Sequence, residues 1–417
     1  MIPVGEASER ILKSIHPLGA ELADLVRANG RVLAATVSAA TTSPPWDNSS
    51  MDGYAVRAAD VAAGGVLRVV GAIAAGSFAD HPLGAGEAMR IMTGAPLPYG
   101  ADSIIRIEDT DEGSELVTIR DLRDARRNVR RLGEDFHEGD SLFETGTELR
   151  AAHLGVLASA GVRSVSVFRA PRVAIVSSGD ELVELGDFDG SASSAAQSGR
   201  SRIVSSNAWT LGQLIRDAGG GPVDFGIARD TPQSLRAKLE EACDCDVLIT
   251  TGGMSVGDHD YAREVFAELG GKLDFWKVSM RPGAPMAFGM LEETPWFGLS
   301  GNPVSAMITF EIFVRPALRR MVGHRKLHRE LIQVRLAEPV ETGAALTHFL
   351  RAIVTRENGE HVARLAGSQS SAVLTAMARA NALLVVPADS RSNPVGATLS
   401  AIPIGDDLKM SDTLGIR

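Results

Sequence analysis

The spacing of hydrophobic and polar positions changes twice along the chain, near residues 171 and 324. Before the first change, apolar positions at helical spacing predict an amphipathic helix over residues 8–28, with Pro17 placed to kink or break it. Residues 54–135 instead show short apolar runs separated by glycines, a pattern typical of a small β-rich domain. The first third of the chain is therefore predicted to join a helix to a domain of short strands.

Between residues 171 and 323, short apolar runs alternate with helical patterns. The predicted strands are 173–177, 223–227, 246–250, 274–278 and 296–299, and the predicted helices are 203–218, 231–242, 261–269 and 303–320. This alternation indicates βαβ units and a mainly parallel sheet, which binds ligands at the carboxyl ends of its strands. After residue 323 the pattern returns to short strands, which predicts a small β domain.

A chain of 417 residues is too long for one ordinary core, so we expect an α/β fold combined with β-rich domains. Residues 132–170 add a loop, a helix over 151–159 and a strand over 164–168 to this plan. The predicted parts are an N-terminal helical and linker domain (1–45 with 136–170), a small β-rich domain (46–135), an α/β domain (171–323) and a C-terminal β domain (324–417).

Composition narrows the class of protein. Hydrophobic residues make up 44% and charged residues 23%, which is typical of a soluble globular enzyme. The net charge of -10, without a long basic stripe, argues against a nucleic-acid partner. Because no apolar run could span a bilayer and no secretory signal is visible, we expect a cytoplasmic location without a membrane partner. Cys243 and Cys245 are expected to be ordinary thiols.

The most informative segment is a glycine turn at residues 249–260, which reads Ile-Thr-Thr-Gly-Gly-Met-Ser-Val-Gly-Asp-His-Asp. It follows an apolar strand and precedes a helical pattern. Such a turn points backbone N–H groups above the sheet, where the helix N-terminus also favours an anion. The carboxylates of Asp258 and Asp260 could hold a cation that bridges this anion to the protein. The turn predicts a magnesium-assisted phosphate or oxyanion site.

Two further strand-to-turn steps lie in the same predicted sheet. In Ser177–Leu182, Asp180 and Glu181 could cap a helix or ligate a metal through water, and Asp230 has the same two interpretations. Residues 298–306 form a second strand–turn–helix step, with Pro303 at the first position of the helix. Each turn could be a plain surface loop, but two in one sheet favour a site that grips both ends of a phosphorylated ligand.

Three other features are weaker when taken alone. The Asp-Gly pair at 52–53 means a tight turn before a strand, and Arg90–Pro98 is a loop that could present the Thr93 hydroxyl. Lys277 and Arg281 are cations near a strand end, as an oxyanion site requires. The chain carries no P-loop, no G-x-S-x-G elbow and no H-E-x-x-H motif.

Taken together, these segments resemble the molybdopterin molybdenumtransferases of the bacterial MoeA type, which are related to the E domain of gephyrin. The resemblance covers essentially the whole chain, and six motifs in one order make it specific. The motifs are Ser-Met-Asp-Gly-Tyr-Ala-Val (50–56), Arg-Ile-Met-Thr-Gly-Ala-Pro-Leu-Pro (90–98), Gly-Glu-Asp (133–135), Ser-Gly-Asp-Glu-Leu (178–182), Thr-Gly-Gly-Met-Ser-Val-Gly-Asp (251–258) and Gly-Asn-Pro-Val-Ser-Ala (301–306).

The resemblance implies the last step of molybdenum-cofactor assembly, in which adenylylated molybdopterin and molybdate enter and the molybdenum cofactor and AMP leave. It implies an elongated, four-part subunit with a central molybdopterin-binding α/β domain. It also implies a homodimer with its active site between subunits, where Asp52 and Thr93 of one copy reach the α/β domain of the other. A molybdopterin adenylyltransferase is a further partner to expect.

The motifs also imply roles for individual residues. The acids that would hold Mg²⁺ and orient pyrophosphate cleavage are Asp52, Asp135, Glu181, Asp230 and Asp260, of which Glu181, Asp230 and Asp260 are the expected metal ligands. The nucleotide and pterin site would be lined by Asn207, Gly252, Gly253, Ser255 and Asn302. The molybdate pocket would be formed by Lys277, Arg281, Pro285, Arg351 and Ser371.

The chain departs from the family pattern at three positions. Ala284 stands where many members have a second lysine, which removes one charge-assisted hydrogen bond worth about 1.5–3 kcal/mol to an anion. Ser300, which we place in the ligand site, stands where a proline is usual, and Ser205 where an aspartate often precedes Asn207. These departures concern molybdate affinity more than the fold.

Two alternative functions stay open from the sequence. The α/β part alone resembles molybdopterin adenylyltransferases, which would consume ATP, although those enzymes lack the large flanking parts. A catalytically degenerate copy could instead serve as a dimeric scaffold, because fold alone does not determine function. The choice between molybdenum and tungsten is not visible in the sequence.

Overall fold

The computed structural model describes residues 1–188, 202–253, 261–405, 408 and 410. The chain divides into two compact units. Unit 1 comprises Met1–Glu21, Gly30–Ala34 and Val167–Arg417, and unit 2 comprises Leu22–Asn29 and Ala35–Ser166. This division is coarser than the four predicted domains, which stay a prediction. Among the described residues, none of the helices combines the length and apolar character that a membrane span needs.

Unit 2 is built around a five-stranded sheet with the strand order β7-β4-β6-β5-β8. Its central strand pairs are antiparallel, except that β5 and β6 run parallel. Buried side chains such as Tyr54, Val56 and Ile105 form its core. The strands are β4 (Gly53–Val56), β5 (Val66–Ile73), β6 (Glu87–Ile91), β7 (Ser103–Arg106) and β8 (Leu116–Thr118).

Shorter elements complete unit 2 and the passage of the chain into unit 1. They are β1 (Ala20–Asp24), α2 (Leu25–Ala28), β2 (Val37–Ser38), β3 (Asn48–Ser49), β9 (Val129–Arg130), β10 (Ser141–Phe143), α3 (Ala151–Ser159) and β11 (Ser164–Phe168). The predicted helix at 151–159 and strand at 164–168 are thus confirmed.

The predicted single helix over residues 8–28 is wrong. Helix α1 spans only Val4–Ser14, and the chain then leaves the helical conformation before Pro17. Proline lacks a backbone N–H and disfavours a helical conformation at the residue before it, so the helix ends there. Ala7 and Ile11 of α1 are fully buried in the core of unit 1. Beyond Ser14 the apolar positions fall in separate short elements, and Leu22 and Val26 are exposed.

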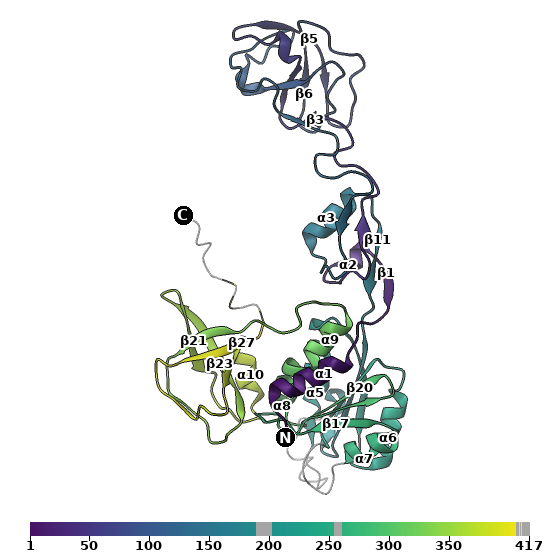
Figure 1. Cartoon of the computed structure of the whole chain (residues 1–417), viewed down its shortest axis with the longest axis vertical. Helices are drawn as coiled ribbons and strands as arrows, with labels where there is room; N and C mark the ends of the chain where they lie inside the picture. Colours follow the sequence, from purple (N-terminus) through teal and green to yellow (C-terminus); the bar gives the residue numbers. More distant parts are fainter. Residues whose placement is uncertain (189–201, 254–260, 406–407, 409, 411–417) are drawn as a thin grey trace. The chain divides into compact units, whose positions relative to one another are not determined.

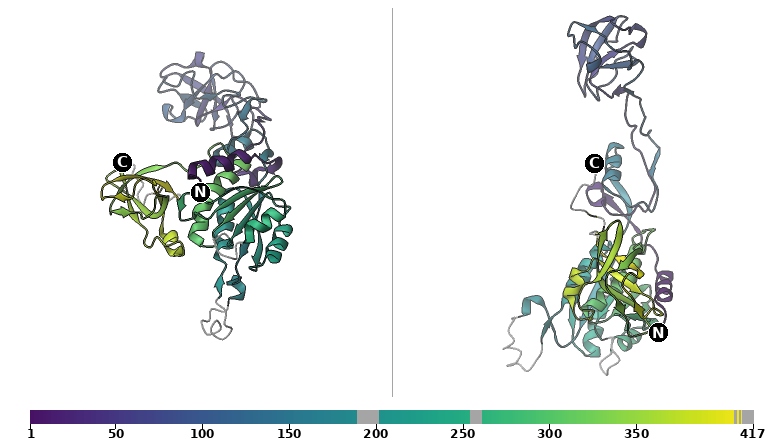
Figure 2. Two further views of the ribbon diagram at one scale, coloured as in Figure 1. Left: turned by 60° about the horizontal axis from the view of Figure 1, so that its bottom comes forward. Right: turned by 90° about the vertical axis from the view of Figure 1, so that its left-hand side faces the viewer.

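The centre of unit 1 is a six-stranded sheet with helices on both faces (Figure 1, Figure 2). Its order is β15-β12-β16-β20-β19-β17, in which β15, β12, β16 and β20 are parallel and the last two strands are antiparallel. The strands are β12 (Arg172–Ser178), β15 (Gly221–Ala228), β16 (Val247–Thr251), β17 (Lys272–Trp276), β19 (Ala287–Leu291) and β20 (Thr294–Leu299).

Alternating side chains of each strand explain the two covered faces, because successive residues of a strand point to opposite sides. Val173 and Ile175 pack in one core with α1, α5 (Ser206–Asp217), α8 (Pro303–Thr309) and α9 (Arg315–Met321). Ala174 and Val176 pack in the other core with α6 (Pro232–Glu241) and α7 (Tyr261–Glu268). The prediction of an α/β domain with a mainly parallel sheet is confirmed.

The C-terminal part of unit 1 is a closed β-barrel. Strands β23, β24, β21, β27 and β25 pair in that order, and β25 pairs back with β23. The barrel strands are β21 (Ile332–Leu336), β23 (Thr347–Glu357), β24 (Glu360–Leu365), β25 (Ala382–Val386) and β27 (Thr398–Pro403). The short strand β18 (Met280–Arg281) from the α/β part adds to β23, which the sequence did not indicate.

An ion pair at the base of the central sheet leads to a stability prediction. Both guanidinium Nη atoms of Arg169 donate to the Asp246 carboxylate, at 2.6 and 2.7 Å, and the Arg172 backbone N donates at 2.7 Å. Burial raises the pKa of Asp246, but these hydrogen bonds outweigh it and leave the pKa below its ordinary value. The pair therefore stabilises the fold only while Asp246 is ionised.

Asp246→Asn is expected to lower the free energy of unfolding at neutral pH by about 1–2 kcal/mol, because half-exposed Arg169 loses its charged partner. A depressed carboxyl pKa contributes stability above the unfolded value of about 3.9 and loses it as the pH falls further. Urea unfolding of both proteins at neutral pH and at several acid pH values measures the difference, which should shrink as the pH falls below the unfolded value of about 3.9 towards the lower folded-state pKa. Exposed Asp244→Asn is the matched control; an equal loss in both variants would contradict the prediction.

Candidate functional site

The carboxyl ends of three neighbouring parallel strands meet at the glycine turn. Gly252 directly follows β16, its N–H donates to the Leu299 carbonyl at 3.2 Å, and its φ is +89°. A Cβ at Gly252 would lie 2.3 Å from the carbonyl oxygen of Ser178 at the end of β12. Only glycine fits this backbone conformation and this close approach. The local sequence thus brings the three turns into contact.

A pocket of about 780 Å³, here called the glycine pocket, opens above these strand ends. It is lined by Ser178, Gly179, Glu181, Leu182, Ile203, Val204, Ser205, Ser206, Asn207, Asp230, Thr251, Gly252, Gly253, Pro285, Ser300, Gly301, Asn302, Pro303, Ala372 and Leu374. Six of the predicted site residues (Glu181, Asn207, Asp230, Pro285, Ser300 and Asn302) therefore lie here together with Gly252 and Gly253 of the glycine turn. The pocket lies where the sequence predicted a phosphate site.

Of the residues that the structure describes, two acids line the glycine pocket, Glu181 and Asp230. Asp230 accepts hydrogen bonds from the Ser178 hydroxyl at 3.2 Å and the Asp180 backbone N–H at 3.1 Å. Asp180 in turn accepts a hydrogen bond from the Asp230 backbone N–H at 3.3 Å. Its carboxylate therefore stabilises the turn, and Asp180 is not among the residues that line the pocket. In the part of the chain that the structure describes, no three His, Cys, Asp or Glu residues are grouped to hold a metal.

Asn207 lies at the start of α5 and is 8% exposed. Its Nδ2 donates to the Gly301 carbonyl at 2.9 Å, whereas its buried Oδ1 has no hydrogen-bond partner within the described part of the chain. A buried carbonyl oxygen without a partner is costly, so it is placed to accept from a bound ligand. The amide thus ties the second turn to α5 and leaves an acceptor in the glycine pocket.

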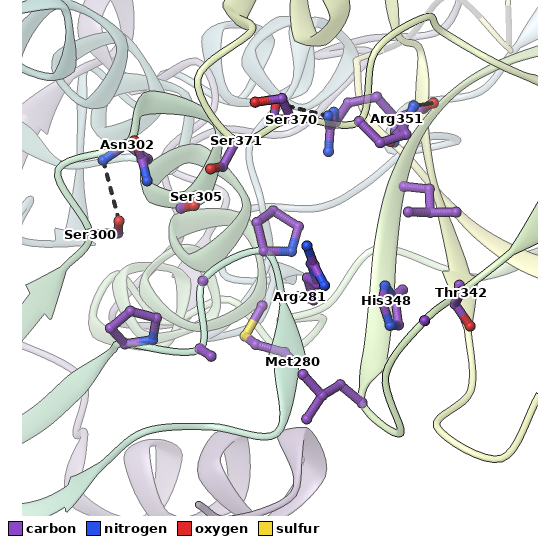
Figure 3. A pocket seen from close by; sticks show the side chains of 18 of the residues that line it. Met280, Arg281, Ser300, Asn302, Ser305, Thr342, His348, Arg351, Ser370 and Ser371 are labelled. Atoms are coloured by element: carbon purple, nitrogen blue, oxygen red, sulfur yellow. Dashed lines mark hydrogen bonds between the residues drawn. The ribbon is translucent and has the colours of Figure 1, made fainter. Parts of the chain in front are cut away.

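A second pocket of about 810 Å³ lies between the α/β part and the barrel of unit 1 (Figure 3). We call it the arginine pocket. It is lined by Met280, Arg281, Pro282, Gly283, Ala284, Pro285, Ser300, Asn302, Ser305, Glu341, Thr342, Gly343, Leu346, His348, Leu350, Arg351, Leu365, Gln369, Ser370 and Ser371. Pro285, Ser300 and Asn302 line both pockets, so the two cavities adjoin.

Arg351 on β23 dominates the electrostatics of the arginine pocket. Its side chain is fully buried, and its Nη2 donates to the carbonyls of Ser368 at 2.9 Å and Ser370 at 3.1 Å. Among the residues that the structure describes, its Nε and Nη1 have no hydrogen-bond partner. Burial lowers the pKa of the guanidinium, but an arginine stays charged at neutral pH. A buried cation with two unused donors is suited to bind an oxyanion by a bidentate contact.

Two further hydrogen bonds hold parts of the wall of the arginine pocket. Ser300 Oγ accepts a hydrogen bond from the Asn302 backbone N–H at 3.2 Å, and the Ser371 carbonyl accepts from the Val304 N–H at 3.2 Å. The second contact joins the barrel to the start of α8. Ala284 lies in the lining of the arginine pocket, at the position where a second cation was expected.

Lys277, a predicted residue of the molybdate pocket, lies beside Trp276. Its Nζ sits 4.1 Å from the centre of the Trp276 ring, and Lys277 is not among the residues that line either pocket. Its φ of +74° turns the chain directly after β17. The role of Lys277 in the molybdate pocket stays a prediction.

Three predicted residues belong to unit 2. Thr93 donates to Asp52 Oδ1 through its backbone N–H at 2.7 Å and its hydroxyl at 2.8 Å. These bonds, the backbone one foremost, lower the pKa of the Asp52 carboxyl and keep it ionised. Asp135 is exposed, and its backbone N–H donates to the Ser43 carbonyl at 3.1 Å. The predicted residues Ser255 and Asp260, together with Asp258, lie outside the described residues.

Several pocket residues escaped the sequence reasoning, foremost His348, Thr342 and Gln369. Gln369 anchors the Arg351 backbone, accepting from its N–H at 2.9 Å and donating to its carbonyl at 3.1 Å. One signal was present: His348 precedes and Arg351 interrupts the apolar run 349–354 of β23, and buried polar residues of this kind are rare without a purpose.

Comparison with known proteins gives three consecutive family matches. Residues 2–161 match the MoeA N-terminal region (domain I and II), residues 174–320 a probable molybdopterin binding domain, and residues 333–404 the MoeA C-terminal region (domain IV). These matches span almost the whole chain in the order that the motifs predicted.

Relatives and solved structures agree with these matches. A molybdopterin molybdenumtransferase of Nostoc sp. is 36% identical, over 88% of this chain and 85% of that protein. Its counterpart from Haemophilus influenzae is 31% identical, over 97% and 98%. A crystal structure of the molybdopterin biosynthesis MoeA protein from Pyrococcus horikoshii superimposes with a TM-score of 0.79 at 27% identity, covering 97% of this chain and 100% of that one.

Proposed function

The chain belongs to the molybdopterin molybdenumtransferase family, and from this premise we propose that it inserts molybdate into adenylylated molybdopterin with release of AMP. This reaction brings together a phosphate-bearing pterin and a tetrahedral oxyanion. The observation that carries the proposal is the adjoining pair of pockets, one built on a glycine turn and the other on a buried arginine with two unused donors.

Each of the two pockets is suited to bind one of the two substrates. In the glycine pocket, the turn at Gly252 and Gly253 and the unpartnered Oδ1 of Asn207 support binding of the adenylylated phosphate and the pterin. In the arginine pocket, Arg351 and Arg281 support capture of the oxyanion. The shared wall would hold the two substrates next to each other, which lowers the entropic barrier to metal transfer.

Mg²⁺ fits the donor set of the glycine pocket. It is commonly bound by one or two carboxylates together with phosphate oxygens and water, and Glu181 and Asp230 supply two carboxylates. Asp260 would be a third ligand, although it lies outside the described residues. When bound, the ion would neutralise charge on the phosphates. The hydrogen bonds from Ser178 and Asp180 would hold the Asp230 carboxylate in place.

The proposed reaction is tested by AMP release from adenylylated molybdopterin in the presence of Mg²⁺, with and without molybdate. Release that depends on molybdate would support the proposal. Binding of the substrate without release would identify a degenerate scaffold instead, and consumption of ATP would identify an adenylyltransferase. Replacing molybdate by tungstate in the same assay determines which of the two metals is inserted.

We also propose that the working form is a homodimer in which Asp52 and Thr93 of one copy contribute to the pockets of the other. The hydrogen-bonded Asp52–Thr93 pair supports this, because it holds an ionised, exposed carboxylate in place on the surface of unit 2. A site shared across a two-fold axis occurs twice in each dimer.

Co-expressed Asp52→Ala and Arg351→Met chains are expected to recover activity that neither variant has alone. A mixed dimer carries both changes in one site and none in the other, so random pairing restores about one quarter of the sites. AMP release by the co-purified mixture, with differently tagged chains, measures the recovery. Asp52→Ala mixed with Thr93→Val is the matched control without recovery. No recovery in the first mixture would show that each copy completes its own site.

A further inference from the structure

We propose that His348 is a proton-linked binding residue of the arginine pocket, which strengthens oxyanion capture as the pH falls. The proposal rests on the proposed function, because the anion in this pocket is taken to be molybdate. It adds to the permanently charged arginines of the pocket a group whose charge changes with pH, and it names the atom that takes up the proton.

His348 is built into the pocket wall rather than lying on the surface. It lies on β23, is only 4% exposed, and lines the same cavity as Arg281 and Arg351 (Figure 3). In the pairing of β18 with β23, Arg281 is its direct register partner. The imidazole and the Arg281 side chain therefore face the pocket from neighbouring strands. An anion that contacts one of the two side chains comes under the influence of the other.

The contacts of the ring identify the atom that titrates. Nε2 lies 3.2 Å from the carbonyl oxygen of Ala344, which can only accept a hydrogen bond. Nε2 must therefore carry the hydrogen in the neutral ring, which assigns the tautomer from the hydrogen-bond network. Nδ1 is then an acceptor in the neutral ring and becomes a donor when protonated.

The surroundings of His348 hold it neutral when no anion is bound. Burial lowers the pKa of the imidazole first of all, the hydrogen bond to Ala344 acts in the opposite direction, and the positive charge of Arg281 lowers the pKa further. The other charged residues in the pocket lining are Arg351 on the same strand and Glu341 on β22 (Val340–Glu341). On the other side, β25 places Val386 opposite His348, which adds no charge.

An oxyanion in the pocket reverses this balance. A dianion close to the ring favours the imidazolium and supplies oxygens that accept from Nδ1–H, so binding of the anion raises the pKa of His348. By linkage, a ligand that raises a pKa binds more tightly in the protonated state. Molybdate affinity should therefore rise as the pH falls below neutral, by up to about tenfold per pH unit for one proton taken up.

The direct test measures binding of molybdate itself, at concentrations too low for it to polymerise, by titration calorimetry from about pH 5.5 to about pH 8. Wild type is compared with His348→Gln, whose amide keeps a donor for the Ala344 carbonyl but does not titrate, and with His361→Gln on β24 as matched control. We expect the pH dependence to persist in wild type and His361→Gln and to flatten in His348→Gln. An unchanged pH dependence in His348→Gln would overturn the proposal.

Proton uptake by the wild-type protein tests the same proposal without a variant. Molybdate binding near pH ~6 should take up protons, which is seen when binding enthalpies are compared in buffers of different ionisation enthalpy. Absence of uptake would overturn the proposal even if His348→Gln failed to fold. If the wild-type protein bound no molybdate at any pH, both this inference and the proposed function would be wrong. Proton-linked binding in a protein that releases no AMP would support the inference and sink the reaction.

Discussion

Replacing Arg351 by methionine is expected to remove the molybdate dependence of AMP release, with use of molybdate at least about 100-fold weaker. The guanidinium offers two unused donors and a full charge to an anion in the arginine pocket, and each charge-assisted hydrogen bond is worth about 1.5–3 kcal/mol. Methionine has a similar length and no donor, so it fills the space without binding the oxyanion.

A second readout separates loss of binding from loss of fold. Replacing an incompletely paired buried cation by an apolar residue of similar volume is often neutral or stabilising, so the melting temperature of Arg351→Met should not fall much. The Gln369 amide would still hold the strand backbone at this position. The matched control is Arg364→Met on β24, where an exposed arginine pairs with Glu357. Arg351→Lys keeps the charge but not the planar fork, so its use of molybdate should lie between that of the wild type and that of Arg351→Met.

The opposite result has a clear meaning. If Arg351→Met used molybdate like the wild type, the oxyanion would bind elsewhere, and the arginine pocket would lose its assigned role. If the variant unfolded under conditions where Arg364→Met is stable, its activity loss would carry no information about binding. If Arg351→Lys then folded, its use of molybdate would test the role of the charged side chain instead.

Replacing Gly252 by alanine is expected to weaken binding of adenylylated molybdopterin by one to two orders of magnitude. The backbone at φ +89° is strained for any other residue, at a cost of about 1–3 kcal/mol. The new Cβ would lie 2.3 Å from the carbonyl oxygen of Ser178, which is backbone at the end of β12 and cannot rotate away. The glycine turn must shift, and its N–H groups with it.

Gly253→Ala provides the matched control for this prediction. Gly253 also has a positive φ, of +61°, but a Cβ there would meet its nearest atom, the Ala262 Cβ, at an ordinary 3.7 Å. It therefore shares the conformational cost and lacks the clash. Equilibrium binding of the substrate without molybdate, together with melting temperatures, compares the two. Equal affinities in both variants would show that the close approach of β12 and β16 does not shape the glycine pocket.

Sequence patterns were accurate where structure depends on neighbours along the chain. The strand–turn–helix steps at 247–253 and 299–303 follow from apolar runs, glycines and a proline at a helix start, all within a few residues. The same kind of reasoning failed over residues 8–28. There the apolar spacing continued across Pro17, although the chain forms α1, β1 and α2 with different burial.

Several features of the site depended on pairings between distant segments. Register pairing of β18 with β23 places Arg281 beside His348, and the closure of the barrel between β23 and β25 fixes the strand that carries Arg351. No local pattern encodes such a register. Lys277 illustrates the same limit. Its Nζ lies over the ring of Trp276 in a cation–π contact, which the spacing of residues along the chain did not predict.

The sequence by itself determined the order of the parts, the α/β character of residues 171–323, the glycine turn and the set of motifs that identifies the family. These properties are local, because backbone conformation and side-chain periodicity depend on nearby residues. Only the tertiary structure decided that two pockets share the wall of Pro285, Ser300 and Asn302, and that Arg351 is buried with two unused donors. Burial and unsatisfied hydrogen bonds result from packing between segments far apart in the chain, so they exist only once the chain has folded.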